Sequence, residues 1–88
     1  MLRITEVRAA SGQVHVLLEG DLTGPWVAEL WTTVRAILDS GGHPLNIDVS
    51  GVRFVDAEGI ALLHQLIGQG LNLSGASAFV AAMLNSGR

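Results

Sequence analysis

The apolar residues of the chain change their spacing abruptly at Asp56. Before it, Leu45, Ile47 and Val49 alternate with polar residues, which is the period of a strand with one buried face. After it, apolar residues recur at the three- and four-residue spacing of a helix face: Ile60, Leu63, Leu66 and Ile67. A strand that passes directly into a helix indicates an α/β fold, in which helical crossovers join parallel strands.

The rest of the chain supplies further elements of the same two kinds. Alternation predicts strands at residues 2–7 and 14–19, joined as a hairpin through the Ser11-Gly12 turn. Helix periodicity predicts a helix that starts at Pro25 and ends at Gly41-Gly42, a second that stops near Gly68, and a short third around residues 79–84. Residues 20–24 are expected to be a loop, residues 51–55 a connection, and residues 71–73 a last strand. The predicted order is β-β-α-β-α-β-α.

The polar half of the alternation predicts how the layers stack. Asn46, Asp48 and Ser50 face away from the apolar set of their strand, whereas a parallel strand covered on both faces would be apolar throughout. We therefore expect a mixed four-stranded sheet with its helices mainly on one face. Val7 and Leu17 lie on the open face with the polar residues, so we expect a monomer or a weak dimer.

Length and charge limit the possible functions. Eighty-eight residues predict a single domain over residues 1–88. The net charge is −3, and the 5 basic residues are arginines scattered along the chain, so no stripe tracks phosphates and nucleic acid is not an expected partner. The chain shows neither a signal-peptide core nor an apolar run long enough to enter a bilayer, which predicts a cytoplasmic protein.

The residues that could hold a metal or perform catalysis do not gather. There is no cysteine, and His15, His43 and His64 are not at ligand spacing, so we expect neither a metal nor another cofactor. The serines fall in turns or at strand ends and suggest no nucleophile with a base beside it. The sequence therefore predicts that the chain is not an enzyme.

The turn between the third strand and the second helix carries the strongest functional signal. Residues 52–60 read Val-Arg-Phe-Val-Asp-Ala-Glu-Gly-Ile, which resembles the switch loop of STAS domains, the fold of bacterial anti-sigma factor antagonists. In that family the loop reads Asp-Ser-Ser-Gly or Asp-Ser-Thr-Gly, and a partner kinase phosphorylates the second hydroxyl residue. Here Ala57 and Glu58 occupy the two hydroxyl positions, and Gly59 follows. The resemblance covers nearly the whole chain and implies a STAS-like fold.

Two residues of this loop have both a structural and a functional interpretation. Asp56 is expected to cap the second helix, and the resemblance adds a role in shaping the loop. Glu58 is either a favourable acid in the first helical turn or a permanent substitute for phosphoserine. The substitution is partial, because one carboxylate supplies −1 where a phosphate supplies about −1.5 to −2. Under either interpretation the phosphorylated hydroxyl is absent.

Three further residues are candidates for partner contact. Asp21, in Leu18-Glu19-Gly20-Asp21-Leu22, resembles with a shift the family's Gly-Glu-Leu-Asp loop beside the switch loop, although it can also be a solvated loop acid. Thr23 follows it. Trp26 lies off the apolar helix stripe and is a possible contact anchor, whereas Trp31 lies on the stripe and is expected in the core.

The resemblance implies a non-enzymatic protein-interaction module that binds an anti-sigma factor or serine-kinase-like switch protein. One alternative is an accessory subunit of a transporter complex, such as the STAS component of a lipid-transport complex, which loss of the hydroxyl favours. A second is a small-ligand sensor, for example of a nucleotide, which Glu58 disfavours because it repels phosphate. The expected contact surface is the sheet end and the second helix: Asp21, Thr23, Asp56, Ala57, Glu58, Gly59, and Ile60 or Ala61.

Overall fold

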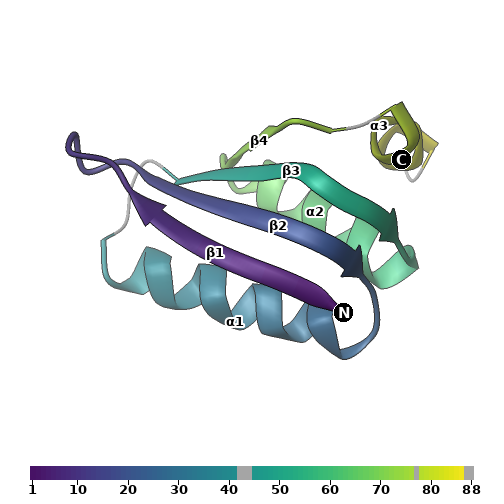
Figure 1. Cartoon of the computed structure of the whole chain (residues 1–88), viewed down its shortest axis with the longest axis horizontal. Helices are drawn as coiled ribbons and strands as arrows, with labels where there is room; N and C mark the ends of the chain where they lie inside the picture. The colour runs from purple at the N-terminus through teal and green to yellow at the C-terminus, as the bar shows by residue number, and fades with distance from the viewer. Residues whose placement is uncertain (42–44, 77, 87–88) are drawn as a thin grey trace.

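The computed structural model describes residues 1–41, 45–76 and 78–86 and places seven elements in the predicted order. His43, expected in a loop, lies outside the described residues. Strands and helices alternate after an initial hairpin (Figure 1). The elements are β1 (Leu2–Arg8), β2 (Val14–Leu22), α1 (Pro25–Asp39), β3 (Leu45–Val55), α2 (Ala57–Gly68), β4 (Asn72–Ser74) and α3 (Ala78–Ser86).

The four strands form a mixed sheet in the order β1-β2-β3-β4. β1 pairs antiparallel with β2, which confirms the hairpin, and β2, β3 and β4 pair in parallel through the helical crossovers. Val14 lies opposite Leu45, and Val16 lies opposite Ile47, so the apolar halves of the two central strands share one face.

The central strands are longer than predicted. Residues 20–22 were expected in a loop and 51–55 in a connection, but Gly20 pairs with Val52 and Leu22 with Val55. Two register shifts in the pairing allow this, because each bulge resets which residues face the core. Leu22 and Val55 are fully buried at the end of the sheet. Gly20 and Asp21 are typical of turns and interrupt the strict alternation, so the sequence pattern did not predict this extension.

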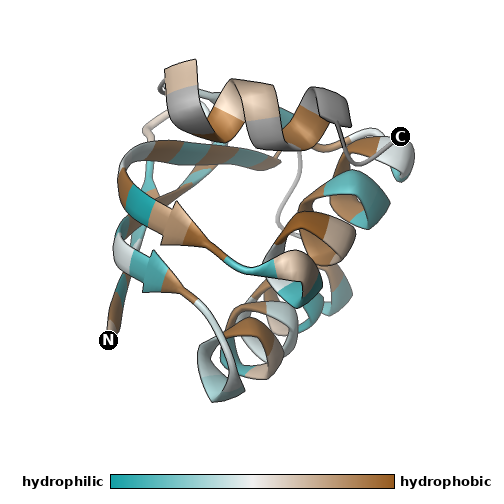
Figure 2. Ribbon diagram, turned by 90° about the vertical axis from the view of Figure 1, so that its right-hand side faces the viewer, coloured by the Kyte–Doolittle hydropathy of each residue, from teal (hydrophilic) through white to brown (hydrophobic). Residues whose placement is uncertain are grey.

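One face of the sheet is covered by α1 and α2, as predicted, and neither of these helices lies on the opposite, open face (Figure 2). Asn46 and Asp48 are half-buried on the open face and are not part of the core. The core joins the inward strand residues to both helices and contains Val14, Val16, Leu18, Leu45, Ile47, Val49, Leu30, Val34, Leu63 and Leu66.

The buried stripe of α2 is rotated from the predicted one. Ile67 was expected in the core but is 44% exposed, whereas Leu62 is only 7% exposed. The difference arises because α2 packs against α1 as well as the sheet, which brings the side of the helix that bears Leu62 inward.

α3 packs beside the sheet, in contact with β3 and α2 (Figure 2). β4 pairs only with residues Asn46 to Asp48, so the rest of the β3 edge is left for α3. Val80 is fully buried, and the His64 ring nitrogen Nε2 lies 2.6 Å from the carbonyl oxygen of Leu84. The side chains of Phe79 and Met83, predicted on the apolar face of this helix, lie outside the described part of the chain.

Candidate functional site

The turn at Asp56 joins two loops that are far apart in the sequence. The Asp56 carboxylate accepts a hydrogen bond from the Gly59 N–H at 2.8 Å, which confirms the predicted helix cap. Its other oxygen accepts one from the Gly24 N–H at 2.9 Å, just before α1. The backbone N–H of Asp56 also donates to the Leu22 carbonyl at 3.2 Å. One residue therefore holds the starts of α1 and α2 together.

These contacts favour the charged form of the carboxylate. The hydrogen bonds from the Gly24 and Gly59 N–H groups hold the pKa of Asp56 below its ordinary value. Both carboxylate oxygens are engaged by the protein's own backbone. Asp56 therefore positions the loop and is poorly placed to meet a partner itself.

Gly59 lets the two loops approach closely. It is buried, and a Cβ at this position would lie 2.6 Å from the Leu22 carbonyl oxygen and 2.6 Å from Cγ1 of Val55. Real side chains do not tolerate contacts this short, so only glycine fits without displacing β2 or β3. Gly59, predicted as a partner-contact residue, lies inside the loop packing, as does Ile60 at 6% exposure.

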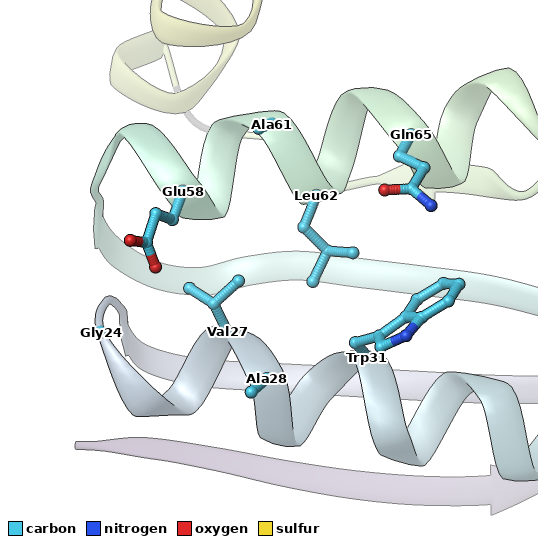
Figure 3. A pocket seen from close by; sticks show the side chains of 8 residues that line it. All are labelled: Gly24, Val27, Ala28, Trp31, Glu58, Ala61, Leu62 and Gln65. Atoms are coloured by element: carbon cyan, nitrogen blue, oxygen red, sulfur yellow. The ribbon is translucent and has the colours of Figure 1, made fainter.

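Ala57 and Glu58 form the exposed part of the turn. In the described part of the chain, no basic side chain lies within ion-pair distance of the Glu58 carboxylate. Figure 3 shows the Glu58 side chain pointing from α2 toward the start of α1, where Gly24 lies. Glu58 thus presents a negative charge that has no basic partner among the described residues.

Asp21 is a strand residue and not the loop acid that was predicted. It is near the end of β2, where its carboxylate lies 3.5 Å from Arg53 Nη2 and 3.8 Å from the amine of Met1. The Arg53 side chain is 76% exposed, so solvent screens this pair. Thr23 follows at the turn, half-buried, and its carbonyl accepts from the Trp26 N–H at 3.1 Å. Both residues lie at the same end of the sheet as Asp56.

The two tryptophans do not divide into core and surface as expected. Trp26, the possible anchor, is half-buried and packs against the core. Trp31 was expected in the core but is also half-buried, with the Arg35 guanidinium 5.8 Å from its ring centre. The stripe pattern placed Trp31 on the inner side of α1, where it packs against the core, but it also lines the groove between α1 and α2, so its side chain is only partly covered.

A shallow groove runs between α1 and α2 from the Asp56 turn (Figure 3). Its volume is about 370 Å³, and its wall is mainly apolar. Sequence reasoning found the turn but missed this groove, because its two walls are separate helices with no local signal for their spacing. The lining residues are Gly24, Val27, Ala28, Trp31, Glu58, Ala61, Leu62 and Gln65.

Two further features are absent from residues 1–41, 45–76 and 78–86. Within these ranges, no three His, Asp or Glu side chains gather where they could hold a metal ion. No helix described there is both long and apolar enough to cross a bilayer.

The mixed sheet, its one-sided helical layer and the turn between β3 and α2 together define a STAS fold. A family model described as "Mlab, STAS domain" matches residues 5–88, and the chain belongs to the STAS domain family. A search of curated protein sequences gives no significant match. STAS domains are generally non-enzymatic modules for protein interaction and regulation.

Proposed function

We propose that the protein is a non-enzymatic, cytoplasmic docking module. It binds a protein partner through the loop end of its sheet, where β2 passes into α1 and β3 passes into α2. Phosphorylation of the loop between β3 and α2 does not switch it. The main support for this proposal is that the residues of the turn at Asp56 have different roles. Asp56 is fully engaged in holding the loops, while Ala57 and Glu58 are exposed and Glu58 is without a basic partner among the described residues. The loop is thus held by hydrogen bonds to the protein's own backbone and carries a permanent charge.

Two kinds of partner fit such a module. In the first, the chain acts as an anti-sigma factor antagonist held in one state, and Glu58 partly reproduces a phosphoserine at the surface of an anti-sigma or serine-kinase-like protein. In the second, it is an accessory subunit, for example of a transporter complex, and Glu58 is a direct contact. The lack of a hydroxyl at positions 57 and 58 favours a role that never used the switch.

A nucleotide sensor is a weaker candidate for a specific reason. Among the described lining residues of the groove, Glu58 is the one ionisable side chain, so the groove is negative where a phosphate would need a positive charge. Neither arginine nor lysine is among these residues.

Site-specific photocrosslinking tests the docking proposal. A benzophenone amino acid placed at Ala57 should crosslink one protein in native extract, which mass spectrometry then identifies. The same group at Ser11, in the exposed β1–β2 turn at the opposite end of the sheet, is the matched control (Figure 1). Equal crosslinking from both positions, or none from position 57, would contradict docking at the loop end.

Substitution of Glu58 separates the two kinds of partner. If the charge reproduces a phosphoserine that opposes binding, Glu58→Ser should strengthen binding to the identified partner about 5- to 150-fold and restore phosphorylation by a kinase partner. Glu58→Gln should strengthen binding in part without restoring phosphorylation. If Glu58 is a direct contact, both variants should bind more weakly. Asp39→Asn, an exposed change at the far end of α1, should leave binding unchanged.

A further inference from the structure

We infer that the groove between α1 and α2 binds an amphipathic α-helix of the partner protein, oriented with a basic side chain over Glu58. This inference rests on the second form of the proposed function, in which Glu58 is a direct contact, and extends it, because it names a second contact region and the chemistry of the segment that occupies it. The groove opens directly from the Asp56 turn, so one partner can reach both (Figure 3).

The shape of the groove suits a third helix. Val27, Trp31 and Leu62 form an apolar floor, and the exposed residues Ala28 and Ala61 stand on opposite walls. Alanines at these two positions keep the walls low. Packed helices lie about 8 to 10 Å apart, and small side chains on the walls favour the close end of that range.

The walls also favour a helix over an extended peptide. Both walls are α-helices, whose backbone N–H and C=O groups are already bonded within each helix. A strand laid in the groove would find no backbone partners on the protein side, whereas a helix arrives with its own backbone hydrogen bonds made. Apolar residues at the i, i+3/i+4 and i+7 positions of that helix can then pack on Trp31 and Leu62.

The charge of Glu58 determines the orientation of the bound helix in the groove. Glu58 lies at the end next to the turn, and Gln65, two helical turns or about 10 Å further along α2, lies at the other. On the bound helix, a lysine or arginine about two turns from the apolar residue nearest Gln65 would lie over Glu58. It would there form an ion pair with the Glu58 carboxylate.

A second copy of the chain does not supply such a helix. α2 and the described residues of α3 contain neither lysine nor arginine. The basic residue of α1, Arg35, is already beside Trp31 and Asp39 of its own helix. We therefore assign the occupant to a helix of a partner protein and not to α1, α2 or α3 of a second copy.

A displayed library of 16-residue helical peptides, selected against the intact chain, tests this inference. Selected peptides should carry apolar residues at helical spacing and a basic residue about two turns away. Ala28→Arg should weaken their binding at least about tenfold, because it fills the groove. Ala36→Arg, at an exposed position on α1 that does not line the groove, is the matched control and should have no effect. Glu58→Lys should reverse the preference to peptides with an acidic residue at that place.

Two results would overturn the inference. One is selected peptides that lack helical spacing or bind the Ala28→Arg and parent chains equally. The other is a partner that is crosslinked from position 57 and whose affinity is unchanged by Ala28→Arg. That result would support the docking proposal but show that the groove is not part of the contact surface. Conversely, groove-binding peptides without any crosslinked partner would contradict the docking proposal alone. Unfolding temperatures of all variants must match the parent to exclude misfolding.

Discussion

Asp48, on the open face, and Asp56, at the loop end, both accept hydrogen bonds from backbone N–H groups, but these bonds join different parts of the chain. Each accepts a backbone N–H, and hydrogen bonds lower the pKa of each, from Ser50 for Asp48 and from Gly24 and Gly59 for Asp56. Asp48 bonds at 2.8 Å to a residue two positions along its own strand. Asp56 bonds to Gly24, which is 32 residues away. The first carboxylate shapes one strand, and the second assembles a site from two loops.

The surroundings of the two aspartates differ in the same way. On the open face, the Asn46 amide lies 3.3 Å from His15 Nδ1 and donates to Ser74 Oγ at 3.2 Å, so polar groups of β2, β3 and β4 bond to one another. At the loop end, Asp56 is satisfied but the neighbouring Glu58 is not paired with a basic group of the described chain. The polar groups of the open face are therefore bonded to one another, whereas the loop end leaves a charge available to a partner.

The largest effect should come from filling the space at Gly59. Gly59→Ala puts a methyl group against the Leu22 carbonyl and Val55, and we expect it to lower the free energy of unfolding by about 2 to 3 kcal/mol. Gly68→Ala is the control in the same helix, because a Cβ there meets nothing within 4 Å. That change should stabilise by about 0.5 to 1 kcal/mol. Urea unfolding of both variants measures the difference, and similar values would contradict tight packing at the turn.

Removing each aspartate side chain tests the comparison directly. Asp56→Ala loses the cap of α2 and the bond to Gly24, so its free energy of unfolding should fall by about 1 to 2 kcal/mol. Asp48→Ala loses only hydrogen bonds to Ser50 on its own strand and should cost about half as much. Amide exchange should show faster opening at Gly24 in the Asp56 variant only. Equal losses without this change at Gly24 would show that Asp56 is merely a local cap.

The pH dependence of stability should distinguish the carboxylates more finely. A lowered folded-state pKa means that the charged form stabilises the fold; this contribution is complete above the unfolded pKa of about 4 and is lost as the pH falls through the folded value. Unfolding measured from pH 6 down to pH 2.5 should therefore show declining stability. Asp56→Asn, which can still cap, should flatten the decline. If the free energy of unfolding of Asp56→Asn falls with pH in parallel with that of the parent, the decline belongs to other groups. Asp48→Asn is then the next variant to measure.

The smallest stability effect should belong to Glu58. Glu58→Gln removes an exposed charge from the first turn of α2, so the free energy of unfolding should change by only about 0.3 to 1 kcal/mol. The same variant should change partner binding far more, as proposed above. A large loss of stability in thermal unfolding would mean that the residue acts within the fold.

The sequence predicted the parts of the fold that depend on local periodicity. Strand alternation gave the one-sided helical layer, and Pro25 marked the start of α1. It did not predict what depends on contacts between distant segments. The bond from Gly24 to Asp56 has no local signal, and the bulges that extend β2 to Leu22 break the alternation on which prediction relied. The partial exposure of Trp31 depends on the spacing of α1 and α2, which neither helix encodes alone.

The position of Met1 has a practical consequence. Its carbonyl accepts from the Asp21 N–H at 2.9 Å, and its amine lies 3.8 Å from the Asp21 carboxylate, so the chain begins at the loop end of the sheet (Figure 1). An affinity tag or fluorescent protein joined ahead of Met1 would remove that amine and stand beside the proposed contact surface. Fusions inserted at the β1–β2 turn, around Gly12, would place the reporter at the opposite end and leave binding measurements undisturbed.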